Sequence, residues 1–159
     1  MNGWVLAAVI AVVLIVVVVK RLRGEPVNAR DLLAPPLILI GIGVASVVKA
    51  EDVTGADLGW LIPGAVLGVA LGAARGATIE VFERGGVLWQ RYTGKSFAVA
   101  AGSLVLMAGF GFLAARAGTH ASARPVQLNI GVSFLGEALV VAARGLSSKV
   151  PFAPERRRR

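Results

Sequence analysis

Five apolar segments alternate with short polar stretches along this chain. Each segment has about 17–20 residues and is built mainly from Val, Leu, Ala, Ile and Gly. At about 1.5 Å of rise per residue, a helix of this length crosses a hydrocarbon core about 30 Å thick. An isolated strand leaves its backbone groups unsatisfied in lipid, so each segment is predicted to be a transmembrane helix. The predicted spans are residues 3–19, 32–48, 58–74, 96–115 and 126–143.

A β-rich stretch, residues 78–93, separates the third and fourth spans. Gly85 and Gly86 at its centre are typical of a two-residue hairpin turn. Folding at this turn pairs side chains on one face, namely Phe82 with Trp89 and Glu80 with Arg91. A lone hairpin is marginal in water, so we expect it to rest on the membrane surface or the inner helix ends. The predicted fold is an all-α membrane protein, a five-helix transmembrane bundle with a short cytoplasmic β-hairpin.

Composition supports a single-domain integral membrane protein. Hydrophobic residues make up 56% of the 159 residues, and the mean hydropathy is +0.75. Such a composition is well above the apolar content of soluble domains. The absence of cysteine excludes disulfides and thiolate metal sites in this chain. A net charge of +8 is typical of nucleic-acid-binding proteins. Here the charges flank the apolar segments, so no nucleic acid partner is expected.

The distribution of basic residues predicts how the chain is threaded. Fourteen of the 17 Lys and Arg residues lie in the segments 20–31, 75–95 and 144–159. The positive-inside rule therefore predicts an outside N-terminus and a cytoplasmic C-terminus, in a multi-pass protein of the cell membrane. We divide the chain into a transmembrane domain, residues 1–145, and a flexible basic cytoplasmic tail, residues 146–159. The tail ends in Arg156, Arg157, Arg158 and Arg159, which either attract anionic lipid headgroups or only fix the topology.

One face of the third span consists of glycines. They recur at every fourth position, as Gly64, Gly68, Gly72 and Gly76. A smooth helix face of this kind lets another helix approach closely and gain van der Waals contact. The spacing favours a helix-packing seam over a substrate passage beside a thin helix.

A polar stripe crosses the fifth span. Asn129, Ser133 and Glu137 follow one another at intervals of four residues and share a helix face. A charge at mid-bilayer depth costs about 2.5–3.5 kcal/mol on insertion scales, so Glu137 needs a partner or a function. One hypothesis makes it the titrating group of a proton or cation site, with Arg75 and Lys95 within reach. The other makes it a hydrogen-bonding link to a neighbouring helix.

Several stretches carry a family resemblance. They read LRGEPVNARDLLAPPLILIGIG, ADLGWL and LGAARGATIEVFERGGVLWQRYTG, and together they fall within residues 1–95. In the order of these motifs this region resembles the CcdC-like group of actinobacterial membrane proteins. The resemblance implies a link to haem-protein and cytochrome biogenesis. It carries over no functional residues.

The sequence contains no recognisable catalytic motif. His120 is the sole histidine and is expected to be a solvated loop residue, and no metal-ligand cluster surrounds it. We therefore predict no catalytic or metal-binding residues, and the sequence identifies no cofactor. A non-enzymatic accessory or assembly protein is the favoured function, with the alternative of a small proton- or cation-coupled transporter or channel that uses Glu137. Beyond the lipid bilayer, the expected partner is another membrane protein or a second copy of the chain.

Overall fold

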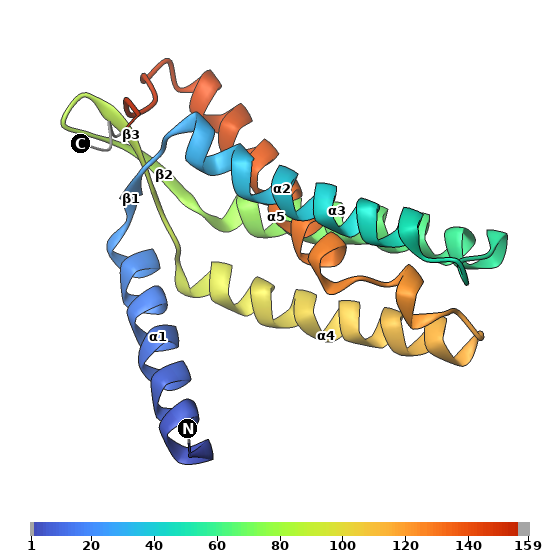
Figure 1. Ribbon diagram of the computed structural model, residues 1–159. Coiled ribbons are helices and arrows are strands. Elements are labelled where there is room, and N and C mark those ends of the chain that lie inside the picture. Colours follow the sequence, from blue (N-terminus) through green and yellow to red (C-terminus); the bar gives the residue numbers. More distant parts are fainter. Residues whose placement is uncertain (1, 156–159) are drawn as a thin grey trace.

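The computed structural model describes residues 2–155 and has five long helices and a small antiparallel sheet (Figure 1). The long helices are α1 (Gly3–Arg23), α2 (Ala29–Lys49), α3 (Gly55–Thr78), α4 (Gly94–Arg116) and α5 (Val126–Ser147), and a 3₁₀ turn, η1 (Ala121–Ala123), precedes α5. By length and composition all five long helices can cross a membrane. The predicted fold class is confirmed.

Polar side chains cap the N-termini of α2, α3 and α4. The side chain of Asn28 accepts hydrogen bonds from the first backbone N–H groups of α2. Thr54 and Asp57 form a capping box at the start of α3, and Thr93 and Ser96 form one at the start of α4. These caps satisfy backbone donors that the helix itself leaves unpaired.

The hairpin has the register that the sequence predicts. Strands β2 (Glu80–Arg84) and β3 (Val87–Arg91) pair Phe82 with Trp89 and Glu80 with Arg91. A third strand, β1 (Glu25–Pro26), pairs with the other edge of β3 and gives the order β1-β3-β2. The sequence did not indicate β1, because two residues that include a proline give no strand pattern.

The sheet packs on one end of the helix bundle. In Figure 1, α1, α2, α3, α4 and α5 all have one end next to the sheet. The core between the sheet and the helix ends is formed by five buried side chains from different parts of the chain, Val27, Ile79, Leu88, Tyr92 and Val141. The hairpin is therefore supported by a small hydrophobic core of its own, which an isolated hairpin lacks.

The segment after α5 is bound to the sheet. The backbone N–H of Leu88 donates to the carbonyl of Pro151 at 2.9 Å, and the N–H of Ala153 donates to the carbonyl of Val27 at 2.8 Å. Phe152 packs against the same core. The expectation of a flexible tail from residue 146 therefore differs from the structure over this stretch, while Arg156–Arg159 lie outside the described residues.

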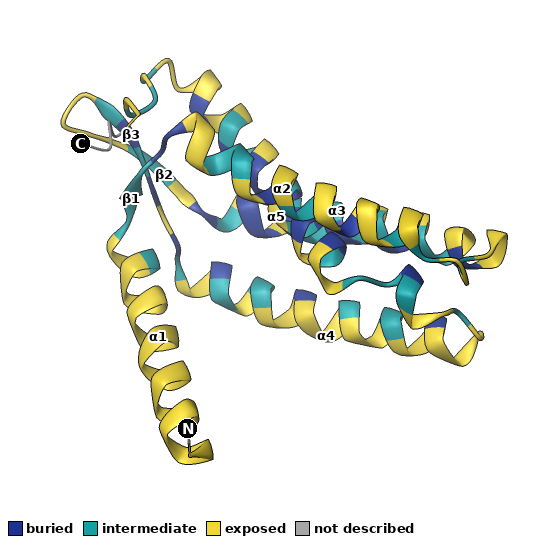
Figure 2. Ribbon diagram, viewed as in Figure 1, coloured by how far each residue is buried: buried dark blue, intermediate teal, exposed yellow. Residues whose placement is uncertain are grey.

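Helix α5 lies at the centre of the bundle, between α2 and α3, and α4 packs against α3. Helix α1 stands apart (Figure 1) and, within residues 2–155, has no buried residue (Figure 2). At its last turn, the carbonyl of Arg21 accepts a hydrogen bond from the N–H of Tyr92 at 3.0 Å. In a bilayer, the apolar surface of α1 faces lipid or a partner helix.

Candidate functional site

Glycines bring the backbones of α3 and α5 into direct contact. A Cβ atom added to Gly72 would lie 1.8 Å from the carbonyl oxygen of Ser133, and one added to Gly136 would lie 2.1 Å from that of Val69. Any larger side chain at either position would force the two helices apart.

The glycine face of α3 and the polar stripe of α5 meet at this seam. Gly68 lies next to Val132 and near the carbonyl of Asn129, while Gly76 lies next to Glu137. Gly64 instead faces Phe110 of α4. Two features that stand far apart in the sequence therefore form one interface, which places Glu137 between α3 and the sheet.

Glu137 is buried, with 5% of its surface exposed, and its two carboxylate oxygens have different partners. The Nε of Arg75 on α3 donates to one oxygen, and the hydroxyl of Tyr92, between β3 and α4, donates to the other. We refer to Glu137, Arg75 and Tyr92 as the Glu137 cluster. The cluster links α5, α3 and the end of the hairpin through charge-assisted hydrogen bonds.

Aromatic rings surround the cluster. The guanidinium of Arg75 lies 5.3 Å from the centre of the Phe134 ring, a cation–π distance. The guanidinium of Arg21 lies 4.9 Å from the ring of Tyr92, and Phe97 contacts the same ring edge-on at 5.6 Å. Burial, followed by the negative charge of Glu137, raises the pKa of Tyr92. Tyr92 therefore keeps its proton at neutral pH and remains a donor to Glu137.

Arg144 lies about two turns after Glu137 in α5 but does not pair with it. Its guanidinium donates to the carbonyl oxygens of Gly76, at 3.2 Å, and of Ile79. These carbonyls belong to the last turn of α3 and the residue after it, where a cation compensates the negative end of the helix dipole. Arg75, rather than Arg144, neutralises Glu137.

The sequence did not indicate Tyr92 as a partner of Glu137, although Tyr92 is the sole tyrosine in the chain and lies at the end of the predicted hairpin.

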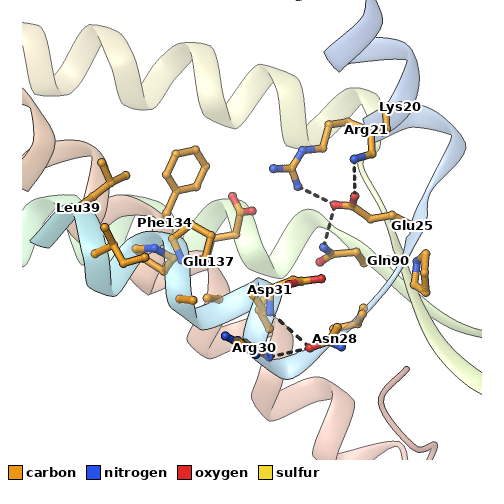
Figure 3. A pocket seen from close by; sticks show the side chains of 18 residues that line it. Lys20, Arg21, Glu25, Asn28, Arg30, Asp31, Leu39, Gln90, Phe134 and Glu137 are labelled. Carbon is orange, nitrogen blue, oxygen red and sulfur yellow. Dashed lines mark hydrogen bonds and ion pairs between the residues drawn. The ribbon is translucent and has the colours of Figure 1, made fainter. Parts of the chain in front are cut away.

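A cavity of about 560 Å³ reaches the Glu137 cluster from the sheet end of the molecule. It lies between the end of α1, the first half of α2, strands β1 and β3, and α5. Figure 3 shows Glu137 and Phe134 on one side of this space and Arg21, Glu25 and Gln90 on another. Its wall is charged near the helix ends and apolar further along α2, where Ile38 and Leu39 line it.

The opposite end of the bundle holds a second polar pair. The Nδ1 of His120 lies 2.8 Å from a carboxylate oxygen of Asp57, and its backbone N–H donates to the other oxygen at 2.9 Å. Asp57 is 2% exposed, and its hydrogen bond raises the pKa of His120. His120 is an exposed loop residue, as expected, with 45% of its side chain exposed, but its pairing with Asp57 was not predicted. The sequence offers no signal for the pair, because 63 positions separate the two residues.

The hairpin presents an aromatic and basic surface on the side away from the bundle. Phe82 and Trp89 are in contact, with ring centres 6.5 Å apart. The guanidinium of Arg84 lies 4.9 Å from the Trp89 ring, and that of Arg91 lies 5.6 Å from the Phe82 ring. Arg91 also pairs with Glu80. We call Phe82, Arg84, Trp89 and Arg91 the aromatic–arginine patch.

Within residues 2–155, the structure holds no group of three or more His, Asp or Glu side chains arranged to bind a metal ion. Comparisons of the chain with protein-family models, with curated protein sequences and with solved structures found no match. Proposals about function therefore rest on the geometry of the chain.

Proposed function

We propose that this chain is a non-enzymatic integral membrane protein that assists the assembly or activity of another membrane protein. The observation that carries the proposal is the aromatic–arginine patch. Interface residues that dominate binding energy are enriched in Trp, Tyr and Arg, and the patch combines Trp89 with two arginines and Phe82. These side chains alternate with Leu88 and Gln90, which are buried on the opposite face of the sheet. The patch therefore points away from the bundle, toward a partner.

The support beneath the patch favours a docking surface over a simple connector. The hairpin is fixed by β1, by the bound segment after α5 and by the core around Leu88. A surface that is rigid before binding loses less conformational entropy when a partner docks. The partner expected from this geometry is a membrane protein with a segment on the same side of the bilayer. The resemblance to CcdC-like proteins makes the membrane proteins of cytochrome biogenesis the first to test.

The Glu137 cluster fits this proposal as a structural link. Both carboxylate oxygens are occupied by donors, and the pairing joins two packed helices to the hairpin. Charged residues within membrane-spanning helices face the bundle interior and pair with one another, and such a pair links the helices that carry it. The cluster thus fixes the platform on which the patch is carried.

We also propose that the sheet lies on the cytoplasmic side of the cell membrane, with the N-terminus outside. Helix ends rich in Lys and Arg gather around the sheet, whereas Lys49, Arg116 and Arg124 belong to the other end. This is the asymmetry that the positive-inside rule describes. A reporter that is active only in the cytoplasm, fused after Arg159, should be active. Activity of a periplasm-specific reporter at the same position would overturn this orientation.

The docking proposal is tested by substitutions within the patch. Phe82→Ala and Arg84→Glu should reduce co-purification of the partner from solubilised native membranes by about tenfold, because truncating a central anchor costs roughly 1–2 kcal/mol or more. Glu83→Ala is the matched control, since Glu83 lies in the same strand on the opposite face. If both patch variants retain their partners as Glu83→Ala does, the patch is not the docking surface.

A second candidate function is proton or cation transport through Glu137. The specific observation in its favour is the cavity, which borders Glu137 and connects it to the sheet end. In proteoliposomes, a transporter of this kind would carry a cation or proton flux that Glu137→Gln abolishes while the chain still elutes as a folded species. Equal flux in wild type, Glu137→Gln and empty vesicles would exclude it.

A further inference from the structure

We propose that the cavity between α1 and α2 binds a membrane phospholipid whose headgroup carries a hydrogen-bond donor in addition to its phosphodiester. This site is separate from the aromatic–arginine patch, and it does not depend on the proposed docking function. It is built from the last turn of α1, the first half of α2, the sheet and α5. The cavity lies where the helix ends give way to the sheet, which corresponds to the level of lipid headgroups if the five apolar helices span the bilayer.

The cationic wall of the cavity suits a phosphodiester. Lys20 and Arg21 both pair with the single carboxylate of Glu25, at 3.6 Å and 3.3 Å (Figure 3). At the α1 end of the cavity these two cations outnumber the Glu25 carboxylate and can contact a ligand phosphate, while the carboxylate of Asp31, at the start of α2, balances the charge of the wall as a whole. The side chain of Lys20 is 71% exposed, so it can turn toward a phosphate at little cost.

The side-chain oxygen of Gln90 is a buried acceptor that a hydrogen-bond donor on the ligand would satisfy. Gln90 is 7% exposed and lines the cavity, and its Nε2 donates to Glu25 at 3.4 Å. Its Oε1 is buried and has no hydrogen-bond partner among residues 2–155. A buried acceptor without a donor is unfavourable, and a ligand hydroxyl or ammonium would satisfy it. Asp31, at the start of α2, adds a negative charge to the same wall, which also favours a headgroup that carries a donor.

The remaining wall suits an acyl chain. Ile38 and Leu39 of α2 line the cavity beyond its charged part, together with Phe134 of α5. Helix α1 diverges from the bundle (Figure 1), and its apolar side chains are exposed along its length. A headgroup bound at Lys20 and Gln90 can therefore leave its chains between α1 and α2, in contact with apolar side chains on both helices. The volume of about 560 Å³ is within the usual range of ligand pockets, about 300–1,000 Å³.

The other charged groups that face the cavity are already paired. Arg30 forms an ion pair with Glu155 at 3.5 Å, and Glu137 is held by Arg75 and Tyr92. Asn28 uses its side-chain oxygen to cap α2. The groups that can turn to a ligand are therefore Lys20, whose side chain is largely exposed, the buried acceptor of Gln90 and the carboxylate of Asp31. A headgroup with one phosphodiester and one nearby donor complements this set.

Native mass spectrometry of the full chain in detergent, titrated with dioleoyl lipids, tests this inference. Phosphatidylethanolamine and phosphatidylglycerol, which carry donors, should bind about tenfold more tightly than phosphatidylcholine, which has the same phosphodiester and no donor. Lys20→Gln should weaken the binding of all three lipids several-fold. Gln90→Met should remove the preference for the two donor-carrying lipids over phosphatidylcholine. Soluble glycerophosphoethanolamine should not compete, because it lacks the chains that the apolar wall binds.

Lys95→Gln is the matched control for general attraction between headgroups and basic residues. Lys95 is an exposed lysine at the sheet end of α4 and does not line the cavity. Wild-type affinity in Lys95→Gln together with weakened binding in Lys20→Gln supports a specific site. Equal binding of the three lipids to the wild type, or equal losses in the two lysine variants, overturns it. Because Lys20 is largely exposed, Lys20→Gln tests the site even if Gln90→Met fails to fold.

Discussion

Removing the carboxylate of Glu137 should strongly destabilise the protein. Removing the guanidinium of its partner Arg75 as well should restore most of the stability. The side chains of Glu137 and Arg75 are 6% and 10% exposed. In Glu137→Leu, the guanidinium of Arg75 stays buried while losing the only anionic partner it has within residues 2–155. One of its nitrogens, Nη2, already has no partner among residues 2–155. Leaving one member of a buried ion pair uncompensated costs about 3–5 kcal/mol.

The double variant separates the cost of the unpaired charge from the loss of the pair itself. Arg75→Met with Glu137→Leu replaces both charges by apolar side chains of similar length, and such replacements of buried ion pairs are often neutral or stabilising. We therefore expect the double variant to lie within about 1 kcal/mol of wild type, allowing for the lost bond to Tyr92. The non-additivity between the single and double variants measures the coupling of the two residues.

The assay is reversible unfolding in mixed micelles, followed by circular dichroism, for the wild type, both single variants and the double variant. We expect a large loss of unfolding free energy in each single variant and recovery in the double variant. A loss below about 1 kcal/mol in Glu137→Leu would refute a structural role for the ion pair. Additive losses in the double variant would show that the two residues act independently.

Three further predictions follow from the same contacts. Tyr92→Phe should cost about 1.5–3 kcal/mol in the same unfolding assay, because it removes a hydrogen bond to a charged group; an unchanged stability would show that the hydroxyl is not bound to Glu137. Gly72→Ala should cost about 3 kcal/mol or prevent folding, because its Cβ would lie 1.8 Å from a carbonyl oxygen of α5, whereas Gly59→Ala, where a Cβ meets nothing within 4 Å, should be tolerated. Asp57 raises the pKa of His120 above its usual value of 6.5, so the pair's contribution to stability should be complete below that value and lost as pH rises through the raised pKa. The melting temperature should therefore fall less with rising pH in His120→Asn than in wild type, and identical pH profiles would contradict the pairing.

The parts of this fold that follow from local pattern were predictable. Five apolar segments determine the helices, and Gly85-Gly86 determines the turn and hence the pairing of Phe82 with Trp89. The glycine repeat and the polar stripe were visible as separate features, because each depends on spacing within one helix. Their meeting at the α3–α5 seam depends on how the helices pack, which spacing alone does not specify.

The contacts that escaped prediction join residues far apart in the chain. Tyr92 donates to Glu137 across 45 positions, and Asp57 binds His120 across 63. The segment after α5 pairs with Val27 and Leu88 by backbone hydrogen bonds, which need no particular side chains. Its polar, proline-containing composition therefore indicated a flexible tail, although its backbone groups and Phe152 complete the core beneath the sheet.

Together these contacts connect the membrane seam to the proposed docking surface. Close approach of α3 and α5 at Gly72 positions Glu137, and Glu137 holds Tyr92 at the junction of β3 and α4. The hairpin is thereby fixed relative to the spans.

Photo-crosslinking in living cells shows directly whether the aromatic–arginine patch binds another membrane protein. A photoreactive residue at position 84, in the patch, is compared with one at position 104, where Leu104 is 73% exposed in the middle of α4. We expect a discrete adduct with a second membrane protein from position 84, lost in Phe82→Ala, and no such adduct from position 104. The absence of a protein adduct from position 84, or the same adducts from both positions, would contradict it.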